Sequence, residues 1–185
     1  MNSSTPDLLV LQVKTVVESK DRSHIRLNSN GGNSILLVCD PTEEMLLIQA
    51  IHQHLTLDQY QTIDLNDLLC EFVNKNREIL IESFDLLKGS PEQIFKLPKH
   101  EEGIDLFSPI MEKISTTYQQ NKIPVLIHTG ALFGSGIDNI HIMEHPVVME
   151  ARNPVVILYP ATHEKDKLLF LGIRPSSKYR CMIVE

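Results

Sequence analysis

Residues 35–39 carry the sequence ILLVC, and residues 40–44 continue it as DPTEE. The first five are apolar without alternation, which is typical of a strand covered by helices on both faces, and such strands occur mainly in parallel sheets. Residues 124–128 (PVLIH) and 154–159 (PVVILY) have the same character, and residues 60–65 are a weaker fourth strand. The pattern therefore predicts a buried, mostly parallel sheet.

Helical patterns separate these strands. Residues 40–43 form a variant capping box, with Pro41 at the first helical position, and predict a helix that ends near Leu55. Thr5 and Pro6 begin an N-terminal helix in the same way, which runs to about Ser19 and is followed by a polar loop at residues 28–33. Further helices are predicted at residues 66–87 in two pieces, at 90–92 as a short turn, and at 108–118.

The C-terminal segments 167–173 and 179–184 alternate between apolar and polar residues, with a turn between them. They predict an antiparallel hairpin on the edge of the sheet. Together the elements predict an α/β fold: a three-layer, open, mostly parallel sheet flanked by helices, of a degenerate P-loop or Rossmann-like kind. The 185 residues suit a single domain, in which residues 1–33 form a helix and loop and residues 34–185 form the core.

Composition limits the classes of function. The formal net charge is −7, and the basic residues do not form runs, so we expect no direct binding of nucleic acid. Cys39, Cys70 and Cys181 lie far apart and predict neither a zinc knuckle nor a disulfide, and Cys39 and Cys181 are expected to be buried thiols. With no signal-peptide pattern and no apolar stretch of membrane-spanning length, we expect a cytoplasmic protein that does not enter a membrane.

Ligands of open α/β sheets bind beyond the carboxyl ends of the strands. Nucleotide-binding folds place a glycine-rich turn after the first strand, where free backbone N–H groups receive phosphate. This chain instead places Asp40, Glu43 and Glu44 there, and Pro41 removes another donor. We therefore expect no nucleotide at this turn, and no cofactor is predicted.

The other strand ends carry no complete catalytic motif. His128 ends an apolar strand and is predicted to be a rim histidine rather than a general base, because no nucleophile is linked to it by a motif. Asp64 and Asp67 are predicted to be helix caps. Residues 130–136 contain Gly130, Gly134 and Gly136, and fit a flexible strand-to-helix turn or a loop that closes over a partner or ligand.

Residues 141–145 match the H-x-x-E-H pattern of inverted zinc peptidases. Two histidines four apart on a helix, His141 and His145, could share a metal, with Glu144 as base. Against this, Pro146 ends the helix, and the only glutamates that could supply a third ligand before the C-terminal residue are Glu150 and Glu164. The favoured interpretation is a helix end exposed to solvent, with a metal-dependent hydrolase as the alternative.

Three apolar runs with their following turns, at residues 35–44, 124–130 and 155–162, together with the closing Tyr179–Arg180, resemble the BrxB proteins of bacterial BREX (bacteriophage exclusion) defence systems. The resemblance covers the chain from about Ile35 to its end. It implies a small accessory protein of an antiviral defence complex, without an assigned activity. Its implied partners are a PglZ-like protein with an alkaline-phosphatase domain, an adenine methyltransferase and a large ATPase.

Three hypotheses follow. The first is a non-catalytic adaptor that binds other BREX components through exposed loops or through the C-terminal edge hairpin. The second is the metal-dependent hydrolase that uses His141, Glu144 and His145. The third is a regulator with a degenerate nucleotide-binding fold, which takes a small ligand at another strand end.

Overall fold

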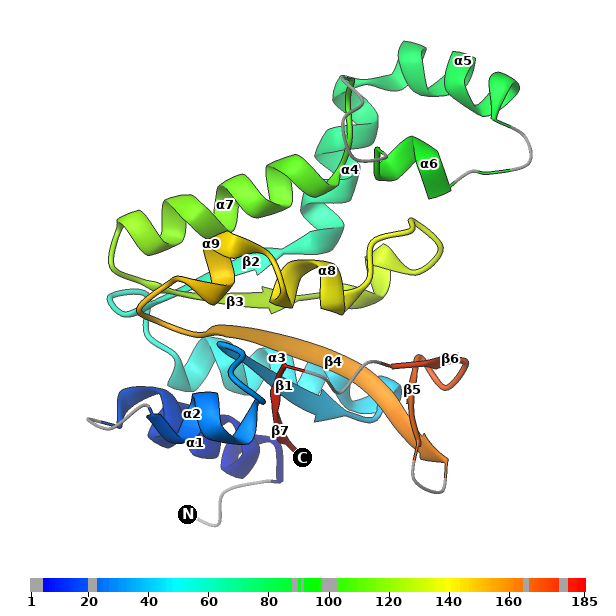
Figure 1. The fold of residues 1–185 in the computed structure, drawn as a ribbon. Helices are drawn as coiled ribbons and strands as arrows, with labels where there is room; N and C mark the ends of the chain where they lie inside the picture. Colours follow the sequence, from blue (N-terminus) through cyan, green and yellow to red (C-terminus); the bar gives the residue numbers. More distant parts are fainter. Residues whose placement is uncertain are drawn as a thin grey trace.

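A computed structural model describes residues 5–19, 23–87, 90, 92–97, 103–164, 167–176 and 180–185, and Figure 1 shows their arrangement. The predicted α/β class is confirmed: helices flank both faces of a mostly parallel sheet. The strands are β1 (Ser34–Cys39), β2 (Tyr60–Asp64), β3 (Ile123–Ile127), β4 (Val155–Glu164), β5 (Lys167–Phe170), β6 (Arg174–Pro175) and β7 (Met182–Val184).

Five of these strands are parallel and lie in the order β2-β3-β4-β1-β7. The three strands predicted from apolar runs are present as β1, β3 and β4, and the weaker fourth strand is present as β2. The central pair is β1 and β4, which are in register from Ser34 opposite Val155 to Cys39 opposite Pro160. Every residue of β1 is buried, as its continuous apolar sequence predicted.

The helices are α1 (Thr5–Glu18), α2 (Ser23–Asn28), α3 (Glu44–His54), α4 (Leu65–Lys75), α5 (Arg77–Leu86), α6 (Glu92–Phe95), α7 (Phe107–Gln119), α8 (Asn139–Met143) and α9 (Pro146–Met149), with 3-10 turns η1 (Pro41–Glu43) and η2 (Thr129–Leu132). The predicted break within residues 66–87 falls at Asn76, between α4 and α5. The short helix α2 was not predicted.

Two apolar clusters fill the space on either side of the sheet. Ile35 and Leu37 belong to the cluster under α1 and α3, whereas Leu36 and Val38 belong to the cluster under α4 and α7. Burying one such side chain contributes roughly 1.5–3 kcal/mol. Because successive residues of a strand point to opposite faces, a strand with helices on both sides must be apolar at every position.

The prediction that residues 167–173 and 179–184 pair with each other as a hairpin is wrong. Residues 167–170 form β5, which pairs antiparallel with the end of β4, with Lys167 opposite Glu164. The last segment forms β7, which pairs parallel with β1 and places Met182 opposite Ile35. An alternating pattern indicates that a segment is a strand but does not choose its partner. Here β4 extends well past Tyr159, and its free end takes the strand that was predicted to pair with β7.

Hydrogen bonds of Asn33 stabilise the start of the central strand pair, β1 and β4. Its side chain is almost fully buried, and Nδ2 donates hydrogen bonds to the carbonyl oxygens of Val148 (3.0 Å), Ala151 (2.9 Å) and Asn153 (3.0 Å). Its own carbonyl oxygen accepts from the backbone N–H of Val155 at 3.1 Å. One amide therefore joins the entrance of β1 to the segment that leads into β4.

We expect Asn33→Ala to lower the free energy of unfolding by about 2–3 kcal/mol, because it leaves buried carbonyl groups without a donor. Urea unfolding followed by circular dichroism measures the change. Asn74→Ala, which alters an exposed residue of α4, is the matched control and should change stability by less than about 0.5 kcal/mol. Equal effects of the two substitutions would contradict this role of Asn33.

Candidate functional site

The turn after β1 is capped by its own carboxylate. Asp40 Oδ1 accepts hydrogen bonds from the backbone N–H of Thr42 at 2.8 Å and from the Thr42 hydroxyl, and Pro41 occupies the first position of η1. These bonds, first that from the hydroxyl and then that from the backbone, lower the pKa of Asp40. The predicted cap is confirmed. The N–H of Thr42, a potential phosphate donor, is thus engaged beside an anion.

Glu44, the first residue of α3, has one carboxylate oxygen, Oε1, that is buried without a hydrogen-bond partner. Burial is the main cause that raises the pKa of this carboxyl group; the negative charge of Asp64 raises it further, and the nearby His128 opposes both. The group is therefore more readily protonated than an ordinary glutamate.

Asp64 and His128 meet at the ends of β2 and β3. Asp64 Oδ1 accepts from the backbone N–H groups of Asn66 (2.9 Å) and Asp67 (3.2 Å), which confirms the predicted cap at Asp64 and makes Asp67 a donor to that cap. Asp64 Oδ2 lies 2.8 Å from Nδ1 of His128. The backbone of His128 is left-handed (φ 52°, ψ 42°), which is uncommon for a residue other than glycine.

The sequence did not predict this pair. The parallel register explains the contact: Asp64 lies opposite Ile127, the last residue of β3, so His128, which follows β3, comes beside the Asp64 carboxylate. The pair fixes the orientation of the imidazole ring. Cys39, at the end of β1, is separated from His128 by the intervening strand β4. Burial raises the pKa of Cys39 to about 12, so this thiol stays neutral. Cys39 and Cys181 are buried, as predicted, and Cys70 is exposed.

The raised pKa of Glu44 predicts a pH-dependent stability. A carboxyl group with a raised pKa in the folded state binds its proton more tightly there, so its contribution to stability falls as the pH rises through that pKa. We expect the free energy of unfolding of Glu44→Gln to increase relative to the wild type as the pH is raised above the ordinary glutamate range. Urea unfolding at several pH values measures the difference, with Glu43→Gln as the control for loss of an exposed charge in the same turn. Parallel stability curves for the wild type and Glu44→Gln would show that Glu44 does not titrate abnormally.

The glycine-containing loop after β3 is tightly organised. Ser135 is buried; its hydroxyl donates to the carbonyl oxygen of Leu132 at 2.7 Å and accepts from the N–H of Ile137 at 3.2 Å. Gly134 and Gly136 have φ of 81° and 76°, values that side chains rarely allow. Ser135 thus stabilises a turn, and the loop forms one wall of a pocket.

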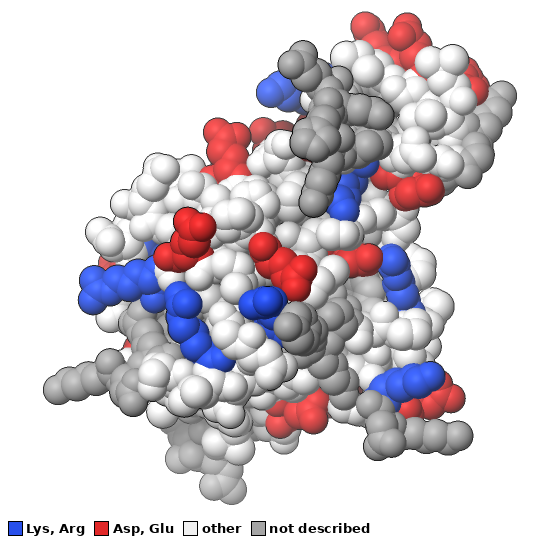
Figure 2. Space-filling model, in the orientation of Figure 1, with Lys and Arg blue, Asp and Glu red and all other residues white. Residues whose placement is uncertain are grey.

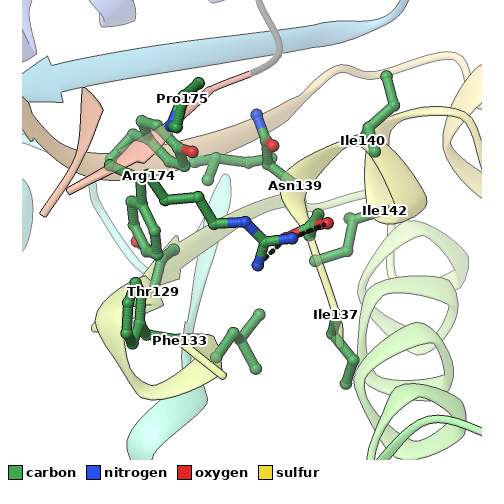
Figure 3. A pocket seen from close by; sticks show the side chains of 13 residues that line it. Thr129, Phe133, Ile137, Asn139, Ile140, Ile142, Arg174 and Pro175 are labelled. Atoms are coloured by element: carbon green, nitrogen blue, oxygen red, sulfur yellow. Dashed lines mark hydrogen bonds and ion pairs between the residues drawn. The ribbon is translucent and has the colours of Figure 1, made fainter. Parts of the chain in front are cut away.

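That pocket has a volume of about 140 Å³ and lies past the end of β3, between the loop and the arm made by β5 and β6 (Figure 3). Its interior is mainly apolar and includes Ile137, Ile157 and Phe170. Arg174 of β6 and Asp138 at the start of α8 join the two walls by a two-pronged ion pair, with Nη1–Oδ1 at 2.8 Å and Nη2–Oδ2 at 3.0 Å.

The H-x-x-E-H residues do not share a helix face. Helix α8 ends at Met143, and His145 instead caps α9, where its Nδ1 accepts from the N–H of Val147 at 3.2 Å. His141 Nδ1 accepts from the N–H of Asp138 at 2.9 Å, and Glu144 forms an ion pair with Arg180 at 3.3 Å. Burial, as the main cause, lowers the pKa of both histidines. Over the described part of the chain, no group of three His, Cys, Asp or Glu side chains is placed to hold a metal ion.

A separate feature of the surface lies on α5, at the far end of α4 and away from the sheet (Figure 1). Large apolar side chains are exposed along it: Leu86 is 84% exposed, Ile81 58%, Ile79 50% and Phe84 46%. Leu80 is its one buried residue. Figure 2 shows acidic side chains on this projecting end of the molecule.

Comparison with protein-family models, with curated proteins and with solved structures finds no match to this chain. Among the described residues, no helix combines the length and the apolar character that crossing a bilayer requires.

Proposed function

We propose that this protein is a non-catalytic adaptor of a BREX-type antiviral defence complex and that it binds another component through α5. The family is proposed on the sequence resemblance alone. The docking surface is proposed on the exposed apolar side chains of α5. Isolated exposed apolar residues are ordinary, but a concentration of them on one projecting element favours a protein-binding role.

The arrangement of α5 divides its surface into stripes. Glu78, Glu82 and Asp85 are spaced by four and three residues and therefore form one acidic stripe. This stripe lies roughly opposite the buried Leu80, so it faces solvent. Apolar side chains flank the stripe on both sides, with Ile79 and Leu86 on one flank, and Ile81 and Phe84 on the other.

These stripes suggest the chemistry of the partner. When a partner covers these apolar side chains, which are 46–84% exposed, each contributes a corresponding share of the roughly 1.5–3 kcal/mol that full burial of a large residue supplies. The acidic stripe between them favours a partner surface that carries Lys or Arg among its apolar residues. The candidate components are the PglZ-like protein, the adenine methyltransferase and the large ATPase that the resemblance implies.

The contacts of α5 support its availability. Among the described elements its main packing neighbours are α4 and α6, and Phe84 meets Phe95 of α6 edge-on, with ring centroids 6.3 Å apart. The anchoring side of the helix is thus held by local contacts. The exposed side chains on its remaining sides are therefore suitable for substitution.

Co-expression with the product of each neighbouring gene, followed by co-purification, tests this proposal. We expect one BREX component to co-purify with the wild type, and Ile81→Glu/Leu86→Glu to weaken that binding about 100-fold, because two apolar contacts are lost and negative charge is added. The matched control is Leu27→Glu/Met45→Glu, whose wild-type residues are 78% and 58% exposed on other helices. The control should bind like the wild type.

Two outcomes would contradict the proposal separately. Equal binding by the two double variants would remove α5 as the docking surface. Absence of methyltransferase, PglZ-like and ATPase genes nearby, or failure of every such product to co-purify, would remove the BREX adaptor itself.

The acidic stripe generates a further expectation. Charge reversal by Glu78→Lys/Glu82→Lys should weaken the same interaction, and the loss should shrink as salt is raised, because salt screens charges on the protein surface. Binding titrations at low and high ionic strength measure this dependence. A loss that does not change with salt would show that the stripe takes no electrostatic part in docking.

A further inference from the structure

The pocket beside β4 is small and enclosed by two different segments. Its volume of about 140 Å³ is close to that of cavities that hold one benzene molecule, about 150 Å³, and lies well below the range of roughly 300–1,000 Å³ for drug-sized ligands. A nucleotide is therefore too large to enter it. A single ring or one branched side chain is the largest group that fits.

Aromatic rings form much of the wall made by β4 and β5 and the lip opposite it. The rings of Tyr159 and Phe170 are stacked, with centroids 4.7 Å apart and an angle of 21° between their planes. Phe133, from the glycine-containing loop, lies 6.3 Å from Phe170 and remains 44% exposed at the lip. Aromatic rings attract further rings in offset or edge-to-face geometry, so this wall favours an aromatic occupant over an aliphatic one of equal size.

The buried polar groups of the pocket are satisfied within the protein, whereas its charged groups are partly exposed. Inside, the Thr129 hydroxyl donates to the carbonyl oxygen of Leu158 at 2.8 Å, and the Tyr159 hydroxyl donates to Ser176 Oγ at 2.9 Å. Arg174 and Asp138, with side chains 45% and 32% exposed, are the charged residues of the lining, and Figure 3 shows the Arg174 side chain that forms their ion pair. A carboxylate keeps lone pairs for a further donor, and a guanidinium can lie over a ring.

We propose that this pocket binds a single aromatic ring with one polar, hydrogen-bonding substituent, of the phenol type, whose ring packs against Phe133 and Phe170 and whose hydroxyl donates to Asp138. The same chemistry is offered by a free phenolic molecule and by a tyrosine side chain of a bound peptide. This site is distinct from α5 and does not depend on the docking proposed there.

Isoleucine methyl groups provide a direct readout. Ile137, Ile142 and Ile157 line the pocket, whereas Ile48 and Ile51 lie in the cluster on the opposite face of the sheet. In spectra of the full-length protein labelled at isoleucine methyl groups, we expect p-cresol at millimolar concentration to produce saturable shifts at the first three residues and none at the last two. Shifts that do not saturate, or that are equal on both faces, would overturn the proposal.

Two comparisons test the chemistry of the occupant. Cyclohexanol, which has a similar size but no aromatic ring, should bind about tenfold more weakly than p-cresol. Toluene, which lacks the hydroxyl, should also bind more weakly than p-cresol, and this difference should vanish in Arg174→Gln, because that variant disrupts the ion pair that positions Asp138. Equal binding of all three probes would show an unspecific apolar cavity and overturn the assignment.

Substitution of the lip provides the matched variants. Phe133→Ala should weaken p-cresol binding about tenfold without unfolding the protein, since the ring is nearly half exposed. Ile173→Ala, which changes a 69% exposed neighbour outside the pocket lining, should leave binding unchanged. Equal effects of these two substitutions would contradict the site.

The last comparison separates the two sources of the ring. N-acetyl-tyrosinamide carries the ring on a peptide backbone. Its binding with pocket-specific shifts would assign the site to a tyrosine of a partner, whereas binding of p-cresol alone would assign it to a free phenolic ligand. If neither compound binds, the proposal is wrong.

Discussion

The parallel pairing of β1 and β4, with helices on both faces, is the constraint on which the rest of the structure depends. The two strands are in register over six residue pairs, and β1 has no exposed position. The side chains of β1 therefore pack into one or the other of two apolar clusters. Its one polar residue is Ser34, at the start of the strand. Asn33 closes the pairing at the N-terminal end, where its buried side chain satisfies three carbonyl groups of the incoming segment.

That pairing decides where chemistry can occur. Because β1, β2, β3 and β4 run in the same direction, their carboxyl ends meet at one edge and bring together Glu44, Asp64 and His128 from three separate connections. The charges at this edge are mostly negative, and the carboxylate of Asp40 already engages the N–H of Thr42 after β1. At this edge, carboxylates cap the turns after β1 and β2, and such an arrangement does not favour the binding of phosphate.

Two surfaces outside this cluster of capped turns remain for binding. On α5 an acidic stripe runs between exposed apolar side chains, a combination that favours a protein partner with basic and apolar groups. The pocket between the β3 loop and the β5–β6 arm is small and aromatic, with its charged groups partly exposed. The two differ in size and chemistry because one is the uncovered side of a projecting helix, whereas the other is a gap between segments that pack on one sheet face.

The sequence by itself determined the layers of the fold, because continuous apolar runs require cover on both faces, and it determined the caps at Asp40 and Asp64, because capping is a local interaction. Only the tertiary structure decided which strands pair: β7 lies beside β1 and β5 beside the end of β4, a choice between partners that alternation cannot make. It also decided that His128 meets Asp64 and that Arg174 meets Asp138, since these pairs join residues 64 and 36 positions apart. Such contacts depend on sheet order and register, which a local pattern does not contain.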